Sequence, residues 1–381
     1  MSAFEVTQTD GQARLGILET GHGSVETPVF MPVGTQGSVK ALPARDLSDM
    51  GARIILGNAY HLYLRPGDEL VKQMGGMQRF AGWDGAMLSD SGGYQIFSLG
   101  VLRKIQEEGV TFQSHIDGSK HFLTPERVVE IQENLGADIC MCLDECVGYP
   151  SSHEYASASA ELTTRWARRC RDAKKSASQL FGIVQGGMYA DLRLRSSRDL
   201  AALEFDGYAM GGFSVGEPKG VMWEMVDVVM GEMPFDKPRY LMGLGFPEDI
   251  VEGVRKGIDM FDCVIPTRHA RNGNLFTQAG RINIKHARYA RDDTPLDGSC
   301  GCYTCTHFSK AYLRHLFVTR ELTSYYLNTL HNVSFYLSLM KRIRAEIGQG
   351  RFEAFYDGFM SELNDPAAGS RVSKTASGSE S

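Results

Sequence analysis

The residue of greatest chemical interest is Asp262, a single acid inside the apolar run 261–265. Pro266 ends this run, and we expect a basic, glycine-punctuated loop with Arg268 and Arg271 to follow it. Burying a carboxylate costs free energy unless the group has partners, so such a residue is either paired or used in chemistry. Taken alone, Asp262 could equally be a helix cap or the ion-pair partner of either arginine.

Polar residues and glycines also follow several other predicted buried strands. In chain order they are Asn58, Asp90 with residues 91–95, Asp144 with residues 145–146, Gln185 with residues 186–187, residues 211–217 and residues 242–245. Each could be a cap or a tight turn, but parallel strands would bring all of them to one rim. Carboxylates beside closely approaching backbone suit a planar polar ligand such as a nucleobase. Tyr94 and Met242 could cover its two faces.

Three cysteines within six residues predict a metal site. They are Cys300, Cys302 and Cys305. With one histidine they would form a Cys3His set of the structural zinc type, closed to substrate. His307 follows the last cysteine very closely, whereas His315 and His331 both fall in expected helices, so spacing alone leaves the fourth ligand open.

The elements that must position these residues alternate regularly along the chain. Apolar runs that suit buried strands lie at residues 29–33, 53–56, 86–88, 139–143, 180–184, 207–210, 240–243 and 261–265. Segments of helical length lie between most of them, at residues 125–135, 154–174, 190–203, 219–230 and 247–258. Eight strands alternating with helices predict an α/β fold, a closed (β/α)8 TIM barrel. A doubly wound open sheet is the alternative, but no Gly-x-Gly-x-x-Gly pattern follows the first strand.

Two insertions interrupt the expected barrel. Residues 109–118 alternate in hydrophobicity and turn at Asp117-Gly118, as in a hairpin inserted after the third strand. We expect residues 1–271 to form the barrel core, with a small N-terminal β element and this hairpin. Residues 272–332 would form a basic zinc-binding insertion, residues 333–363 a helical segment that completes the barrel, and residues 364–381 a disordered tail.

Composition places the chain among soluble globular proteins, with 43% hydrophobic and 23% charged residues. No apolar run is long enough to span a membrane and no signal-peptide pattern opens the chain, so we expect a cytosolic protein. The net charge is −6, yet residues 264–344 hold twelve Lys and Arg against four Asp and Glu. A basic segment on an acidic body suits a polyanionic partner, although any single basic residue could simply be solvated.

Together these motifs resemble those of the bacterial tRNA-guanine transglycosylases, up to about residue 363. The matching segments are residues 89–95, 144–146, 184–187, 211–217 and 262–273, with the Cys-x-Cys-x2-Cys set. The resemblance implies a (β/α)8 barrel with an inserted zinc subdomain. It further implies exchange of the wobble guanine of tRNAs with a G-U-N anticodon for the 7-deazaguanine preQ1. Family members of this type are homodimers, so a homodimer is implied as well.

The resemblance also assigns roles to individual residues. Asp262 would be the nucleophile and Asp90 the general acid and base. The base would be bound by Asp90, Tyr94, Asp144, Gln185, Gly212, Phe213, Glu217 and Met242, with Tyr94 and Met242 sandwiching it and Glu217 steadying the loop beneath Phe213. The zinc ligands would be Cys300, Cys302, Cys305 and His331. The tRNA would be contacted by Arg268, Arg271, Lys285 and Arg288.

The chemistry of base exchange agrees with two carboxylates. Exchange at C1′ with retention needs two displacements, as in a retaining glycosidase, and no metal or redox cofactor takes part. Cys146 and Val215 match members that accept the small preQ1, whereas Phe213 stands where leucine is expected. A catalytically inactive tRNA-binding subunit and a carbohydrate glycosidase are the alternatives. Retention of both acids argues against the first, and the basic segment argues against the second.

Overall fold

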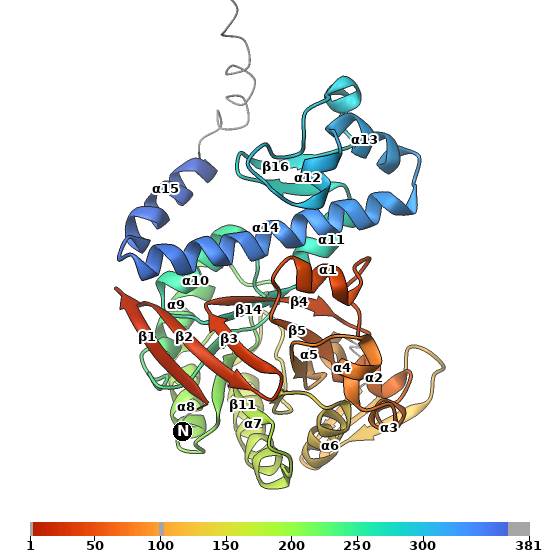
Figure 1. Ribbon diagram of the computed structural model, residues 1–381. Helices are drawn as coiled ribbons and strands as arrows, with labels where there is room; N and C mark the ends of the chain where they lie inside the picture. The colour runs from red at the N-terminus through yellow and green to blue at the C-terminus, as the bar shows by residue number, and fades with distance from the viewer. Residues whose placement is uncertain (1–2, 99–102, 365–381) are drawn as a thin grey trace, which may run out of the picture.

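The computed structural model describes residues 3–98 and 103–364 of the 381-residue chain. Eight parallel strands close into a barrel in the order β4-β5-β6-β10-β11-β12-β13-β14, with β14 paired back to β4 (Figure 1). Their bounds are β4 Val29–Gly34, β5 Ile54–Asn58, β6 Ala86–Asp90, β10 Ile139–Met141, β11 Gln179–Val184, β12 Gly207–Met210, β13 Arg239–Leu241 and β14 Met260–Cys263. The predicted α/β barrel is confirmed, and each strand overlaps one of the predicted apolar runs.

Alternate residues of these strands fill the barrel interior, because successive side chains of a strand point to opposite faces. Met31 and Ile183 belong to this buried inner cluster, whereas Phe30 packs into the outer core beneath the helices. A three-stranded antiparallel sheet closes the end where the barrel strands begin, and its Leu18 and Val25 join the inner cluster. Its strands are β1 Phe4–Asp10, β2 Ala13–Thr20 and β3 Gly23–Thr27. The polar residues at the carboxyl ends of the barrel strands therefore lie at the opposite end of the barrel.

Helices surround the barrel. The bounds are α1 Ala44–Asp49, α2 Ala59–Leu64, α3 Asp68–Gln73, α4 Gly76–Ala81, α5 Gly93–Ser98, α6 Pro125–Leu135, α7 His153–Ala173, α8 Ala190–Ala201, α9 Lys219–Met230 and α10 Pro247–Arg255. The start predicted for α6 is confirmed, because the Thr124 side chain accepts a hydrogen bond from the Arg127 N–H. Within residues 3–98 and 103–364, no helix combines the length and the apolar character needed to cross a membrane.

The predicted hairpin is present as part of a larger insertion. Strands β8 Gly109–Gln113 and β9 Lys120–Leu123 pair antiparallel around a turn that contains Asp117 and Gly118. A further strand, β7 Arg103–Gln106, pairs with β8. This third strand was not predicted, because its residues alternate little in polarity.

The segment after β14 differs from the expected loop. Residues Ile265–Arg271 form helix α11, with Pro266 in its first turn. Proline is favoured there because the first helical N–H groups need no partner inside the helix, so Pro266 starts a helix instead of preventing one. The prediction that Arg268 and Arg271 lie in a loop is therefore wrong.

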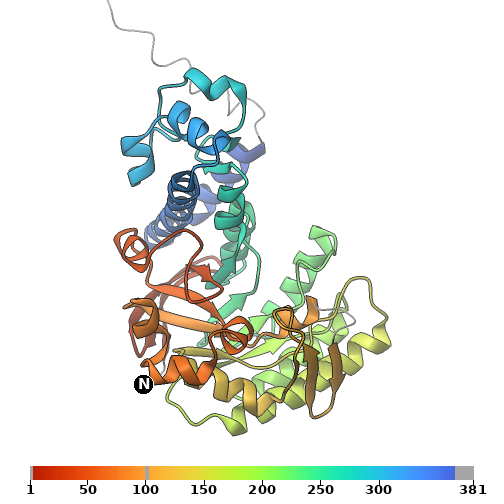
Figure 2. The same cartoon turned by 90° about the vertical axis from the view of Figure 1, so that its right-hand side faces the viewer.

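After α11, residues 274–318 form an upper subdomain, and two C-terminal helices follow it up to residue 364. The elements are β15 Asn274–Thr277, β16 Gly280–Asn283, the 3-10 helix η2 Ala287–Arg291, α12 Tyr303–His307, α13 Lys310–Val318, α14 Leu322–Gly348 and α15 Phe352–Asn364. In Figure 2 this upper subdomain stands above the barrel, with α14 between them. The boundary expected between residues 332 and 333 falls inside α14, which is continuous there. The predicted disordered tail lies, from residue 365 onward, outside the described residues.

Helix α14 is fixed to the barrel along its length. The Asn332 side chain donates to the Pro266 carbonyl oxygen at 3.0 Å, and the Tyr336 hydroxyl donates to the Gly245 carbonyl oxygen at 2.6 Å. Further along, Arg344 donates to the carbonyl oxygen of Pro28, just before β4. The first two contacts place α14 directly over the segments that follow β13 and β14.

Candidate active site and metal centre

Asp90 lies at the end of β6, buried at the rim of the barrel. Its carboxylate accepts hydrogen bonds from the Asn58 side-chain amide at 2.6 Å and from the Ala59 N–H at 3.1 Å. Burial is the main cause that raises the pKa of Asp90 to about 8, and the charge of Asp262 acts in the same direction. Asp90 is therefore mostly protonated at neutral pH, which suits a general acid.

Asp262 lies on β14 at the same rim and is partly exposed to solvent. One carboxylate oxygen, Oδ1, accepts hydrogen bonds from the Tyr240 hydroxyl at 2.6 Å and from the Gly243 N–H at 2.8 Å. Burial raises the pKa of Asp262, while these two hydrogen bonds oppose the rise. Both donors contact Oδ1, and Oδ2 accepts no hydrogen bond from another described residue, so it keeps its lone pairs for another partner.

Asp144 and Gln185 lie side by side after β10 and β11. The Gln185 side-chain amide donates to Asp144 Oδ2 at 2.7 Å, and burial raises the pKa of Asp144 to about 6. The Gln185 Oε1 atom is buried without a hydrogen-bond partner among the described residues. Glycine is required around this pair, because a Cβ atom at Gly93 would lie 2.3 Å from Asp144 Oδ1 and one at Gly211 would lie 2.7 Å from Gln185 Nε2.

The loop after β12 is held from inside by Glu217. Its two carboxylate oxygens accept hydrogen bonds from the Ser214 N–H at 2.6 Å and the Val215 N–H at 2.9 Å. Gly212 has a φ of +70°, a conformation that glycine adopts without strain, and Phe213 is buried beside it. The sequence-predicted residues of this loop thus share one rigid turn next to Gln185.

Tyr94 and Met242 lie at the two sides of the rim. Tyr94 is on α5 and 53% exposed, so its ring is open to a ligand. Met242 follows β13 and is partly exposed. Tyr94 follows β6 and Met242 follows β13, two strands on opposite sides of the closed barrel, so the mouth of the barrel lies between them.

Two side chains of the site were not singled out from the sequence. Tyr240 lies inside the barrel and carries the hydroxyl that contacts Asp262. Arg193 projects from α8 into the loops after β11 and β12. Neither had a sequence signal, since Tyr240 sits in an ordinary apolar run and Arg193 is one of three arginines on α8.

The metal centre is assembled from α12, the loop before it and α14. Its four residues are Cys300, Cys302, Cys305 and His331, and their ligand atoms all lie within 4.8 Å of one another. The Nδ1 atom of His331 lies 3.2 Å from the Cys305 sulfur, while its Nε2 atom lies 2.7 Å from the Phe276 carbonyl oxygen. Three thiolates and one imidazole, oriented by a backbone carbonyl, fit a closed tetrahedral site. His307 and His315 do not belong to this group.

Of the four predicted tRNA-contacting residues, Arg268, Lys285 and Arg288 are exposed and Arg271 is partly exposed. Arg268 and Arg271 are on α11, and Lys285 and Arg288 are on the segment from β16 into η2. Arg271 donates to the Thr267 carbonyl oxygen at 2.9 Å. Among the residues that the structure describes, none of the four forms an ion pair with an acid, so their charges are available to an outside anion.

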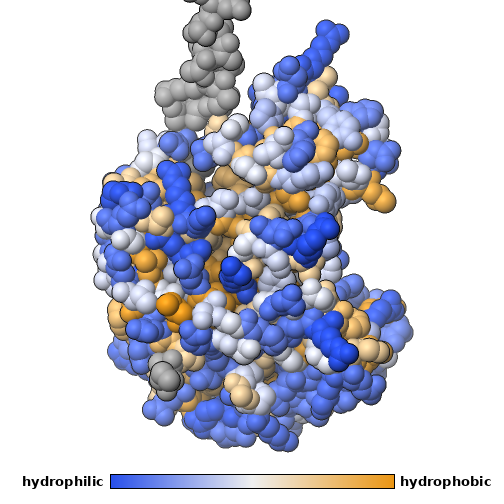
Figure 3. Space-filling model, in the orientation of Figure 1, coloured by the Kyte–Doolittle hydropathy of each residue, from blue (hydrophilic) through white to orange (hydrophobic). Residues whose placement is uncertain are grey.

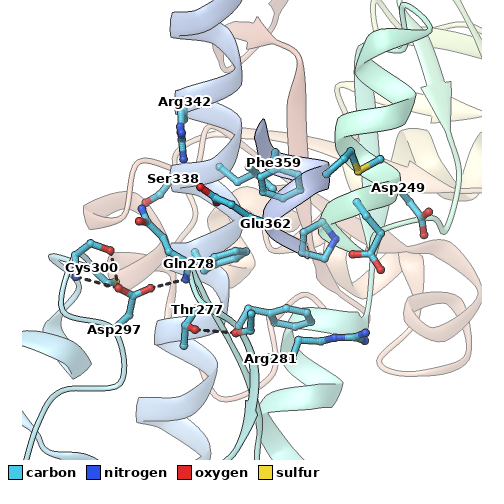
Figure 4. A pocket seen from close by; sticks show the side chains of 18 of the residues that line it. Asp249, Thr277, Gln278, Arg281, Asp297, Cys300, Ser338, Arg342, Phe359 and Glu362 are labelled. Atoms are coloured by element: carbon cyan, nitrogen blue, oxygen red, sulfur yellow. Dashed lines mark hydrogen bonds between the residues drawn. The ribbon is translucent and has the colours of Figure 1, made fainter. Parts of the chain in front are cut away.

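A cavity of about 560 Å³ lies away from this rim, between α10, the β15–β16 hairpin, α14 and α15 (Figure 4). Phe359 and Arg342 line it on one side and Asp249 on another, and Cys300 connects it to the metal centre. None of the predicted catalytic or base-binding residues contributes to it. On the face of the molecule in Figure 3, hydrophobic residues are visible between the upper subdomain and the helices beside it, while most of the face is hydrophilic.

Comparison with known proteins identifies the family of this chain. Residues 9–365 match the family described as Queuine tRNA-ribosyltransferase. A protein of that name from Solidesulfovibrio magneticus is 58% identical over 355 residues, which are 92% of this chain and 95% of the relative. Another of that name from Pelotomaculum thermopropionicum is 56% identical over 94% of this chain and 98% of its own length. The chain therefore belongs to the queuine tRNA-ribosyltransferase family.

Proposed function

We propose that this protein is a tRNA-guanine transglycosylase that replaces the wobble guanine of tRNAs with a G-U-N anticodon by preQ1, in queuosine biosynthesis. Its substrates would be the tRNAs for Asp, Asn, His and Tyr. The observation that carries the proposal is the pair Asp90 and Asp262, one mostly protonated at neutral pH and one with a free carboxylate oxygen. The reaction needs such a pair, one group to protonate and one to attack.

The proposed reaction has two displacements at C1′ of the nucleotide. Asp262 Oδ2 attacks C1′, the bond from C1′ to the guanine nitrogen breaks, and Asp90 gives its proton to the departing base. In the second step the ring nitrogen of preQ1 attacks C1′ and breaks the ester to Asp262. Asp90 takes the proton from that nitrogen and returns to its starting state. Two inversions give net retention, as in retaining glycosidases.

The base would be held edge-on by the groups beside the two acids. Asp144 would accept the N–H donors that guanine and preQ1 share, and Gln185 and the Gly212 N–H would complete that edge. Tyr94 and Met242 would sandwich the ring. The backbone of Phe213, steadied by Glu217, would meet the 7-aminomethyl group that only preQ1 carries.

We further propose that the metal centre binds one structural Zn²⁺ per chain, because the Cys3His donor set favours zinc and leaves no open position. The ion would hold the upper subdomain together and take no part in the reaction. Arg268, Arg271, Lys285 and Arg288 would contact the anticodon loop. The cytosolic location and the homodimer stay predictions, and light scattering of the purified protein tests the second.

The decisive experiment uses unmodified tRNA with radiolabelled guanine at the wobble position. We expect release of the label on addition of preQ1, and a covalent protein–RNA adduct that survives denaturation. Asp262→Asn should abolish the adduct, whereas Asp227→Asn, at an exposed carboxylate on α9, should leave it intact. No release of label under conditions where tRNA binds would refute the activity. An adduct that survives in Asp262→Asn would assign the nucleophile elsewhere.

A tRNA-binding subunit without activity is the alternative from another class. It would bind tRNA and release no label. The retained acids and the paired Asp144 and Gln185 argue against it, because a binding subunit has no need to bury carboxyl groups at raised pKa.

A further inference from the structure

Arg193 is a buried cation that the proposed reaction does not yet use. It projects from α8 with none of its side chain exposed. Its Nη1 atom donates to the carbonyl oxygens of Val184 at 3.0 Å and Gly211 at 2.7 Å. Its Nε atom donates to the Gly187 carbonyl oxygen at 2.9 Å, and its Nη2 atom to that of Gly212 at 3.4 Å. All these acceptors are neutral carbonyl groups, so within the described part of the chain no carboxylate neutralises the guanidinium by direct hydrogen bonding.

Val184 ends β11, and the other three acceptors belong to the two loops that carry the base-binding groups. Gly187 lies within the loop after β11, which begins with Gln185, while Gly211 and Gly212 open the loop after β12. A surface cation would gain little from such contacts. Burying one costs considerable free energy, and the hydrogen bonds to several carbonyl groups offset that cost.

Binding of these carbonyl groups fixes the opposite sides of their peptides. In a planar trans peptide, the C=O of one residue and the N–H of the next point in opposite directions. With its carbonyl held by Arg193, the Gly211–Gly212 peptide turns the Gly212 N–H away from the guanidinium. No hydrogen bond links this N–H to another described residue, which leaves it free for a ligand.

Glu217 acts on the next peptides from the other side. It binds the Ser214 N–H, and the Phe213 carbonyl oxygen therefore points away from Glu217. Arg193 and Glu217 thus orient successive peptides of one loop by opposite charges. The loop presents first an N–H donor, at Gly212, and then a carbonyl acceptor, at Phe213.

The ring of Phe213 covers the guanidinium. Its centroid lies 4.1 Å from the Arg193 Cζ atom, a cation–π contact, and the ring is buried. Burial lowers the pKa of Arg193 to about 10, so the group stays charged at neutral pH. The aromatic residue found where leucine was expected is thereby given a function in this chain, since leucine has no π face to offer a cation.

We propose that Arg193, covered by Phe213, is a positioning residue that sets the direction of the Gly212 N–H toward the base. This inference rests on the proposed base exchange. An N–H donor at that position suits the ring carbonyl oxygen, the acceptor on the edge that guanine and preQ1 share. Arg193 therefore serves recognition of both bases, whereas Glu217, acting through the Phe213 carbonyl, serves only the base with the 7-aminomethyl group.

The test compares the KM values for guanine, preQ1 and tRNA. Arg193→Lys keeps a charge but lacks the planar fork that reaches several carbonyls. We expect it to raise the KM for guanine and for preQ1 by the same factor, about tenfold, as for one impaired charge-assisted hydrogen bond. The KM for tRNA should stay within about twofold of the wild-type value. Glu217→Gln should instead raise the KM for preQ1 more than that for guanine.

Matched variants separate positioning from folding. Arg195→Lys lies on the same helix, at an exposed ion pair with Glu161, and should leave all three KM values unchanged. Phe213→Leu keeps every hydrogen bond of Arg193 and should raise both base KM values by a smaller, equal factor. The adduct assay gives the concentration of active sites in each preparation.

Unchanged base KM values in Arg193→Lys would overturn the proposal, and so would a rise for preQ1 alone. A loss of folded protein without any KM change in the remaining active sites would make Arg193 structural only. Absence of guanine exchange by the wild-type enzyme would instead refute the proposed function itself.

Discussion

Replacing Asp90 by asparagine should make the folded protein more stable at neutral pH while it removes activity. The pKa of Asp90 is raised from 3.8 to about 8 on folding, mainly by burial. The folded state therefore keeps a proton that the unfolded state has already lost between these two pH values. Stability falls as pH rises through that window, by 1.36 kcal/mol per pH unit, roughly. At pH 7 the accumulated cost to the folded state is about 4 kcal/mol.

Asparagine does not titrate and so avoids this cost. Its single oxygen can accept from Ala59 or from Asn58, but not from both as the two carboxyl oxygens do. The lost hydrogen bond should cost about 1 kcal/mol. The net expectation is a variant about 3 kcal/mol more stable than the wild type at pH 7, with equal stability near about pH 4.5.

Urea denaturation at several pH values between 5 and 8, followed by the fluorescence of the buried Trp83 and Trp166, measures this difference. Asp117→Asn is the control, because hydrogen bonding by Ser119 holds the pKa of Asp117 at about 2. Its carboxylate is ionised throughout this range in both states, so its difference from the wild type should not depend on pH. An Asp90→Asn difference that is equally flat would mean that folded Asp90 is ionised, and would refute its assignment as the acid.

Three further outcomes follow from the site. The profile of kcat/KM against pH should be bell-shaped, falling below about 6 as Asp144 takes up a proton and above about 8 as Asp90 loses its own; a flat profile from pH 6 to 9 would contradict both roles. Arg268→Ala and Arg271→Ala should each weaken tRNA binding and reduce the slope of log K against log salt by about 1, whereas the exposed Arg198→Ala on α8 should change neither. Removal of zinc by a chelator, followed by metal analysis and filter binding, should release one ion per chain and weaken tRNA binding; unchanged affinity would make the metal centre peripheral to RNA recognition.

The parallel barrel could be predicted because its strands are buried on both faces and read as short apolar runs between helices. That topology also predicted the rim, since the ends of parallel strands must lie together. Asp90, Asp144 and Asp262 were therefore expected to be neighbours. The helix after β14 could not be predicted from the rule that proline ends an element, because Pro266 also lies in the first turn of the next element. Arg193 was beyond reach for another reason. Its partners are backbone carbonyl groups, which carry no residue identity, so nothing in the sequence distinguishes it from its neighbours on α8.

Resemblance contributed what spacing could not. Cys300 to Cys305 predicted a metal, but three histidines competed for the fourth position. The choice depends on how α14 passes over α12, which is a tertiary contact between residues such as Cys305 and His331, 26 positions apart in the chain. Phe213 is the opposite case, a departure that the sequence exposed and that only the neighbouring guanidinium explains.

The 27-residue helix α14 has a consequence for how this architecture can change. One helix carries His331, the proposed metal ligand, and, beyond it, Tyr336 and Arg344, which bond the barrel. An α-helix advances about 100° per residue, so one inserted or deleted residue between His331 and Tyr336 would rotate the two sets of contacts out of phase. Either the metal ligand or the barrel contact would then face solvent. Insertions and deletions should therefore be absent between His331 and Tyr336 and tolerated near the two ends of α14. The upper subdomain and the barrel are thus held at one fixed rotation relative to each other about this helix.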